Sequence, residues 1–172
     1  MSSKICQDRV VIVTGSGRGI GRAHALEFAR QGAKVVSQGP AGEVVDEIRA
    51  MGGEAVVNGA DVADFDAARQ LVQTSIDTFG RLDVVVNNAG FLRDRMFLKI
   101  SEEEWDAVIR VHLKGHFCVS RHAAEYWRNE SKAGNAVDGR IINTSSGAGL
   151  QGSVGQATYS AAKGGIATLT LV

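Results

Sequence analysis

The most informative part of the chain reads RVVIVTGSGRGIG, residues 9–21. Its short apolar, β-branched run is typical of a buried strand, and from Ile20 apolar residues recur at helical spacing until Gly32. The glycines between them leave backbone N–H groups open to a phosphate, and the start of a helix attracts negative charge. This strand-turn-helix context predicts dinucleotide binding, with a purely structural turn as the alternative. No Gly-Lys-Ser/Thr follows, which argues against ATP or GTP hydrolysis.

Strands and helices alternate along the rest of the chain. The expected strands cover residues 9–14, 34–36, 55–58, 82–86 and 140–143. The expected helices run from 20 to the stop at Gly32, over 44–51 and 65–79, from a capping box at 101–104 through 119, and from 157 to the end, with a surface loop at 129–138. Apolar strands alternating with helices indicate a parallel sheet covered on both faces. We therefore predict a doubly wound, Rossmann-like α/β fold with three layers, α/β/α, in a single domain of residues 1–172.

Composition narrows the function classes. Nineteen basic and nineteen acidic residues give a formal net charge of zero, which argues against nucleic-acid binding. No apolar run is long enough to span a membrane, and the N-terminus has no hydrophobic signal region. Cys6 and Cys118 fit neither a CxxC pair nor a zinc pattern, so we expect free thiols and a cytoplasmic location. His112, His116 and His122 lack acid or thiol partners, and we expect no metal site.

A second motif, Asn87-Asn-Ala-Gly90, follows an apolar strand directly. In an open α/β sheet this carboxyl end of the strand borders the ligand crevice. Asn side chains can tie neighbouring strands together, and Ala-Gly leaves space for a flat ligand. The motif therefore fits a ligand site, and it fits a simple helix-entry turn equally well.

A third constellation comprises Ser146, Tyr159 and Lys163. Tyr159 and Lys163 are four residues apart and share one face of a helix. A phenol is a poor base at neutral pH, and an ammonium held nearby favours the phenolate. Ser146 precedes the helix and could hydrogen-bond the same substrate oxygen. A Tyr-x-x-x-Lys pair also occurs by chance on exposed helices. Its position after the other two motifs, in the expected order, is what makes it informative here.

Together, TGSGRGIG (14–21), NNAG (87–90), Ser146 and YSAAK (159–163) resemble the short-chain dehydrogenase/reductase family. The resemblance runs from Arg9 to the last residue. LRDR (92–95), Trp105-Asp106, RVHL (110–113) and GQA (155–157) are similar to one subgroup, the (3R)-hydroxyacyl-CoA dehydrogenase or 17β-hydroxysteroid dehydrogenase domain of the peroxisomal multifunctional enzyme and its bacterial single-domain relatives. The family continues beyond the residue that matches Val172, so the resemblance implies that the C-terminal part of the fold is absent from this chain.

The resemblance also implies roles for single residues. The pyrophosphate of a nicotinamide cofactor would be lined by Gly15, Ser16, Gly19, Ile20 and Gly21, with Arg18 beside them. Asp61 and Val62 would meet the adenine, and Asn88, Ala89 and Gly90 the ribose and nicotinamide. Tyr159 would be the acid/base, Ser146 would orient the substrate oxygen, and Lys163 would bind the nicotinamide ribose and favour the phenolate.

Two departures from the family pattern are visible. His112 stands where many relatives have an Asn that helps to hold a water in the proton relay; an imidazole could pass a proton there, or it could simply pack. The second strand ends in Ser37-Gln-Gly-Pro40 without the usual ribose-binding acid. We expect residues to be missing between Val36 and about Ser37. Arg18 hints at NADP, whereas the resemblance to the subgroup hints at NAD. We expect NAD, with NADP as the alternative.

The expected activity is an oxidoreductase that transfers a hydride between NAD(P)(H) and a secondary alcohol or ketone. The expected small-molecule substrates are 3-hydroxyacyl or 3-oxoacyl thioesters, on CoA or on a carrier protein, with hydroxysteroids next. The alternative is a non-catalytic protein that senses nicotinamide cofactors or serves as a structural subunit. By analogy with the family we also expect a homodimer or homotetramer.

Overall fold

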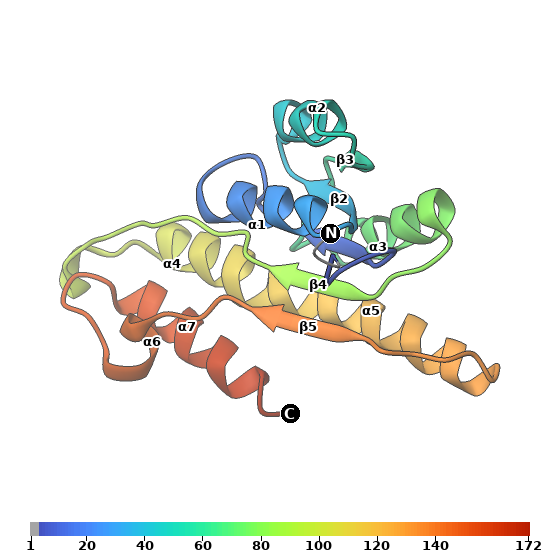
Figure 1. Ribbon diagram of the computed structural model, residues 1–172. Coiled ribbons are helices and arrows are strands. Elements are labelled where there is room, and N and C mark those ends of the chain that lie inside the picture. Colours follow the sequence, from blue (N-terminus) through green and yellow to red (C-terminus); the bar gives the residue numbers. More distant parts are fainter. Residues whose placement is uncertain (1–3) are drawn as a thin grey trace.

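A five-stranded parallel sheet forms the centre of the computed structural model, which describes residues 4–172. The strand order is β3-β2-β1-β4-β5, as Figure 1 shows. The strands are β1 (Val10–Val13), β2 (Lys34–Gln38), β3 (Ala55–Asn58), β4 (Val84–Asn87) and β5 (Arg140–Asn143). The chain crosses over at β1, so the ligand crevice of such a sheet is expected between the carboxyl ends of β1 and β4.

Helices cover both faces of the sheet. They are α1 (Gly19–Arg30), α2 (Gly42–Ala50), α3 (Phe65–Phe79), α4 (Glu102–Ile109), α5 (Gly115–Lys132), α6 (Gly147–Gln151) and α7 (Ala157–Leu169), with a 3-10 turn η1 (Phe97–Lys99) and a π-helix η2 (Arg110–Lys114) between α4 and α5. Strand residues alternate between two hydrophobic cores: Val11 and Val35 pack under α1 and α2, whereas Ile12 and Val36 pack under α3 and α5. The three-layer, Rossmann-like α/β fold predicted from the sequence is confirmed.

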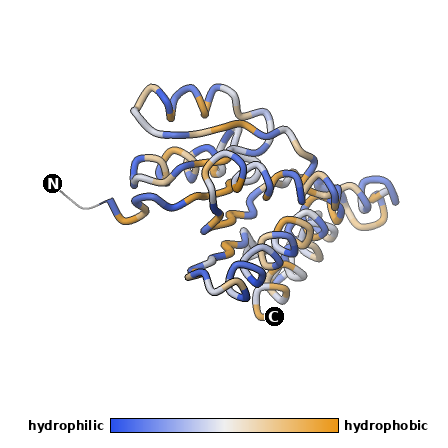
Figure 2. The backbone as a smooth tube through the Cα atoms, turned by 90° about the vertical axis from the view of Figure 1, so that its right-hand side faces the viewer, coloured by the Kyte–Doolittle hydropathy of each residue, from blue (hydrophilic) through white to orange (hydrophobic). Residues whose placement is uncertain are grey.

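Hydropathy follows the layers. In Figure 2 the hydrophobic stretches gather in the interior strands, and the outer helices alternate between hydrophilic and hydrophobic turns. Strand β5 is the exception, because its outer side carries no further strand among residues 4–172 and Ile141 and Ile142 are exposed.

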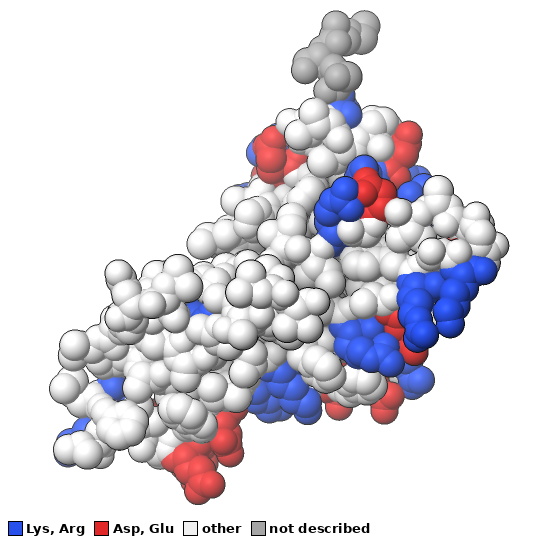
Figure 3. All heavy atoms as spheres, turned by 90° about the horizontal axis from the view of Figure 1, so that it is seen from below, with Lys and Arg blue, Asp and Glu red and all other residues white. Residues whose placement is uncertain are grey.

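Seen from below, the molecule has a broad surface with few charges (Figure 3). Within residues 4–172 no helix is both long and apolar enough to cross a membrane.

Several element boundaries differ from the prediction. Strand β2 does not stop at Val36 but continues to Gln38, in unbroken register with β1 and β3 across Val36 and Ser37. The structure therefore shows no gap there, and a longer segment at this point stays a prediction. Helix α5 extends to Lys132, into the expected surface loop. The capping box of Ser101 and Glu104 is confirmed, but the helix it opens is interrupted by the π-helix.

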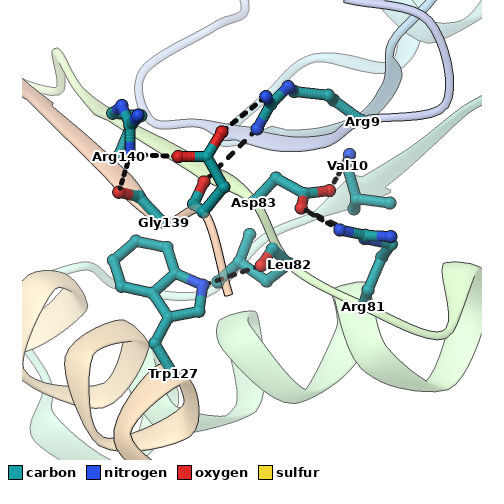
Figure 4. Close-up of polar contacts among 9 residues, drawn as sticks. Arg9, Val10, Arg81, Leu82, Asp83, Trp127, Gly139 and Arg140 are labelled. Carbon is teal, nitrogen blue, oxygen red and sulfur yellow. Dashed lines mark hydrogen bonds and ion pairs between the residues drawn. The ribbon is translucent and has the colours of Figure 1, made fainter. Parts of the chain in front are cut away.

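The amino end of the sheet is held together by a buried carboxylate, Asp83 (Figure 4). It accepts a hydrogen bond from the backbone N–H of Val10 at 2.8 Å and pairs with Arg81 at 2.6 Å. Next to it, the indole N–H of Trp127 donates to the carbonyl of Leu82 at 2.7 Å. These bonds fasten β1, the approach to β4, and α5 to one another at the end of the sheet opposite the glycine-rich turn.

Candidate active site

The glycine-rich turn between β1 and α1 opens onto a groove of about 680 Å³. The residues that line it are Gly15, Gly17, Arg18, Gly19, Ile20, Gly21, Pro40, Asn88 and Gly90. A Cβ on Gly15 would lie 2.7 Å from the Cα of Ala89, and one on Gly21 would lie 2.3 Å from the carbonyl oxygen of Gly15. A side chain at either position would therefore collide with the backbone that shapes the groove.

Gly19, at the start of α1, differs from these packed glycines. Its φ of +56° favours glycine, and a Cβ there would meet no described atom within 4 Å. No side chain among residues 4–172 caps the amino end of α1, so its first N–H groups remain available to a ligand. A glycine cradle at an uncapped helix start is the arrangement that binds a pyrophosphate, and these residues fit a dinucleotide.

Thr14 fixes the Asn-Asn-Ala-Gly motif against the first strand. Its hydroxyl oxygen accepts hydrogen bonds from the N–H groups of Asn88 at 2.9 Å and Ala89 at 3.0 Å. The Asn88 amide donates in turn to the Thr14 carbonyl at 3.0 Å. The structure thus brings Asn88 and Gly90 to the groove, and Ala89 packs against the turn beneath it. Sequence reasoning missed Thr14, although its position directly before the first glycine was a usable signal.

Gln38 is a second residue that sequence reasoning missed. Its buried amide accepts from the N–H of Gly15 at 2.8 Å and donates to the carbonyl of Ala60 at 2.6 Å. Its backbone carbonyl accepts from the hydroxyl of Ser16, which is fully buried. The predicted cofactor residue Ser16 therefore points into the end of β2 and does not line the groove. The end of β2 carries no carboxylate that could bind a ribose.

The predicted adenine residues, Asp61 and Val62, are not among the residues that line the groove. Asp61 pairs with Arg110 at 2.5 Å and accepts a hydrogen bond from the N–H of Ala63 at 2.9 Å. Burial raises the pKa of Asp61, but these two bonds outweigh it and hold the pKa below its usual value. Val62 is buried in the core, where a Cβ on Gly115 would lie 3.0 Å from its side chain.

A smaller pocket of about 170 Å³ adjoins the groove. Its lining residues are Ile20, Asn88, Gly90, Phe91, Leu92, His112, Thr144, Tyr159 and Lys163. Three of these residues, Ile20, Asn88 and Gly90, also line the groove. A dinucleotide in the groove would therefore extend toward the side chains of the pocket.

Tyr159 and Lys163 share one face of α7, as predicted. The Lys163 ammonium lies 5.6 Å from the centroid of the Tyr159 ring and donates to the carbonyl of Thr144 at 2.5 Å. Lys163 is only 2% exposed, and burial lowers its pKa to about 8. At neutral pH the side chain is still largely protonated, so it presents a positive charge beside the phenol.

Ser146 occupies a different place. It is the N-cap of α6, and its hydroxyl oxygen accepts a hydrogen bond from the N–H of Ala148 at 3.2 Å. The hydroxyl proton is left to donate elsewhere. Ser146 does not line the pocket that contains Tyr159 and Lys163.

His112 lies in the pocket on the π-helix, with its ring edge-on to Tyr159 at a centroid distance of 5.4 Å. Its Nε2 is 2.8 Å from the carbonyl oxygen and 3.0 Å from the N–H of Phe91. Either tautomer can thus bond to Phe91, while the buried Nδ1 has no partner among the described residues. Burial, aided by the charge of Lys163, lowers the pKa of His112 despite the bond to Phe91.

Gly90 is what allows the ring to sit there, because a Cβ at Gly90 would lie 2.1 Å from the Cε1 of His112. His112 therefore occupies the space in front of the Asn-Asn-Ala-Gly motif. Within the described part of the chain, no group of three His, Cys, Asp or Glu side chains could hold a metal ion.

His116, one helical turn further, gives a stability prediction. Burial and the charge of Lys163 lower the pKa of His116 to about 4, from an ordinary 6.5. Between pH 6.5 and 4 the unfolded chain binds a proton that the folded chain does not. The free energy of unfolding should therefore fall as the pH drops through this range, by up to about 3 kcal/mol from this residue. Chemical denaturation at several pH values measures it.

The matched control is His24, a half-buried histidine on α1. His116→Gln should reduce the pH dependence between 6.5 and 4, to which His112 also contributes, whereas His24→Gln should leave it in place. A His116→Gln variant with the wild-type pH dependence would show that His116 is not the group responsible.

Known proteins resemble this chain over nearly its whole length. The family described as short chain dehydrogenase matches residues 9–172. Hydroxyacyl-CoA dehydrogenase ChsB1 of Mycobacterium tuberculosis is 51% identical over 95% of this chain and 55% of its own length. Peroxisomal multifunctional enzyme type 2 of Mus musculus is 49% identical over 92% of this chain and 22% of its own length.

A solved structure, a short chain dehydrogenase from Mycobacterium avium, superimposes with a TM-score of 0.95 at 65% identity. The match covers 96% of this chain and 63% of that one. The chain thus spans about half the length of ChsB1 and less than two thirds of the solved structure.

Proposed function

The chain belongs to the short-chain dehydrogenase family, and from this premise we propose that it interconverts a 3-hydroxyacyl and a 3-oxoacyl thioester with a nicotinamide cofactor. The observation that carries the proposal is the continuity of the glycine-lined groove with the pocket of Tyr159, Lys163 and His112. The resemblance expected from the sequence, to the family and to the dehydrogenase domain of the peroxisomal multifunctional enzyme, is confirmed.

The groove residues would hold the cofactor. The free N–H groups at the start of α1 and the positive end of the helix dipole suit the pyrophosphate. Asn88 and Gly90 lie where the groove meets the pocket and would border the nicotinamide end. A bound nicotinamide supplies the hydride acceptor or donor for the substrate carbon.

The pocket residues would move the proton. Tyr159 gives a proton to the forming alkoxide, or takes one from the alcohol in the reverse direction. Lys163, held by Thr144, stabilises the phenolate by its charge. His112 can exchange the proton between its two nitrogens while keeping its bond to Phe91, which suits a relay. Ser146 is not among the residues that line this pocket, and its contact with the substrate oxygen stays a prediction.

Substrate choice rests on the relatives. ChsB1 is named as a hydroxyacyl-CoA dehydrogenase, which favours a thioester over a hydroxysteroid. The test follows nicotinamide absorbance with 3-oxoacyl-CoA, 3-oxoacyl carrier protein and a ketosteroid, each with NADH and NADPH. Turnover of a thioester supports the proposal. Cofactor binding without any turnover would favour the alternative of a non-catalytic sensor.

The choice between NAD and NADP concerns Arg18. Arg18 lines the groove, makes no ion pair among residues 4–172, and no carboxylate lines the groove with it. An arginine with no acidic residue beside it suits the 2′-phosphate on the ribose of NADP better than the free ribose hydroxyls of NAD. The groove lining therefore favours NADP(H) over the NAD expected from the subgroup. Arg18→Ala should raise the KM for NADPH about 10-fold and change that for NADH little.

Arg18→Lys serves as the control, because it keeps the charge and should lose less of the preference. Equal changes of KM for both cofactors in Arg18→Ala would contradict a contact with the 2′-phosphate. The homodimer or homotetramer and the cytoplasmic location expected from the sequence stay predictions.

A further inference from the structure

The segment that follows the Asn-Asn-Ala-Gly motif forms one side of the pocket mouth. Phe91 and Leu92 line the pocket, and the chain then continues outward through Arg93, Asp94 and Arg95. Figure 1 shows this segment at the same end of the molecule as the loop before α7. The exposed part of the segment, from Arg93 to Arg95, therefore begins directly after two residues of the pocket lining.

Hydrogen bonds tie this segment to the loop before α7. The N–H of Arg95 donates to the carbonyl of Gly155 at 2.8 Å, and the amide of Gln156 donates to Asp94 at 3.0 Å. The guanidinium of Arg95 pairs with Glu104 at 3.1 Å. Both Asp94 and Arg95 thus have partners that hold the segment in place.

Arg93 has no such partner. Its guanidinium carbon lies 4.9 Å from the centroid of the Phe91 ring, and its one hydrogen bond in the described chain goes to the carbonyl of Leu92 at 3.1 Å. No carboxylate of residues 4–172 lies within 4.0 Å of it. Stacking on Phe91 places the cation directly beside a residue that lines the pocket.

We propose that Arg93 binds a phosphate of the substrate's thioester carrier and so selects thioesters over uncharged ketones. A guanidinium binds phosphate through two parallel hydrogen bonds, and Arg93 has further N–H donors beside the one bonded to Leu92. A hydroxysteroid or a simple ketone carries no such group. This inference rests on the proposed function, because it identifies the substrate class of the same pocket.

The experiment compares substrates with and without the phosphate. Arg93→Ala should lower kcat/KM for 3-oxoacyl-CoA about 10-fold and leave that for the N-acetylcysteamine thioester of the same acyl group unchanged. Arg93→Lys should recover part of the loss. The matched control is Arg128→Ala, which removes an exposed arginine from α5 and should alter neither value.

Two further arms separate the sources of the phosphate. A loss with 3-oxoacyl-CoA alone points to the nucleotide phosphates of CoA, and an equal loss with 3-oxoacyl carrier protein points to the phosphopantetheine phosphate that both share; either supports the inference. A fall of the same size for the N-acetylcysteamine thioester, or no fall with either carrier, would overturn it.

The proposed function fails in a different way. Wild-type protein that turns over no thioester refutes the dehydrogenase proposal itself. Direct binding of free coenzyme A to the protein with its nicotinamide cofactor then still decides on Arg93. Weaker binding to Arg93→Ala than to wild type supports phosphate recognition, and equal binding overturns it.

Discussion

Tyr159→Phe is expected to lower kcat at least about 1000-fold, because it removes the pocket hydroxyl that we propose exchanges a proton with the substrate oxygen. The phenylalanine keeps the ring, and with it the edge-on contact to His112. Lys163 also keeps its bond to Thr144. The cofactor dissociation constant should therefore change less than about threefold, as measured by fluorescence titration.

The chain offers its own control for this substitution. It contains two tyrosines, and the other, Tyr126, borders a cavity at the amino end of the sheet, beside Asp83 and Trp127. Tyr126→Phe removes the same atom far from the pocket and should leave kcat within about twofold of wild type. Near-native turnover by Tyr159→Phe would rule out the proposed acid/base role.

The second large effect is expected at Gly19, where Gly19→Ala should weaken cofactor binding about 100-fold. The added Cβ would meet no atom of residues 4–172 within 4 Å, and Gly19 lines the groove, so we expect the methyl group to keep a pyrophosphate from the free N–H groups of α1. Two lost hydrogen bonds to a charged group account for a change of this size. The left-handed backbone should also cost about 1–2 kcal/mol of stability.

Gly52→Ala is the control that distinguishes backbone strain at a positive φ from obstruction of the cofactor groove. Gly52 has a φ of +81° and an equally open surround, but it follows α2 and does not line the groove. The two variants should lose similar stability in thermal denaturation, and only Gly19→Ala should lose cofactor affinity. If both variants bind the cofactor like wild type, the turn is not the pyrophosphate site.

Local patterns were enough to predict much of the fold. The run of four valines and isoleucines in β1, the helical spacing in α1 and α3, and the capping box of Ser101 each depend on residues close in sequence. The same holds for Tyr159 and Lys163, because four residues on one helix bring them together without any help from the rest of the chain.

Features that depend on distant partners were not predictable. Ser16 was expected in the groove, but its burial follows from a carbonyl at the end of β2, more than twenty residues away. The ion pair of Asp61 with Arg110 joins two elements far apart in sequence, and the contact of Asp61 with the adenine stays a prediction. The end of β2 was placed too early because Ser37 and Gln38 are polar, and the structure buries both. The spacing of apolar residues along the chain carries no information about such contacts between distant residues.

The π-helix Arg110–Lys114 gives the chain a point that tolerates a change of length. A π-helical turn bonds residue i to i+5 and so holds one residue more than an α-helical turn. Deleting one residue in this segment would let it close as regular α-helix, so Cys118, Val119 and Ala123 of α5 would keep their place in the core. In evolutionary terms, this segment can lose a residue while α4 and α5 stay in place, whereas the same deletion in the middle of α5 would turn every later residue of that helix by about 100°.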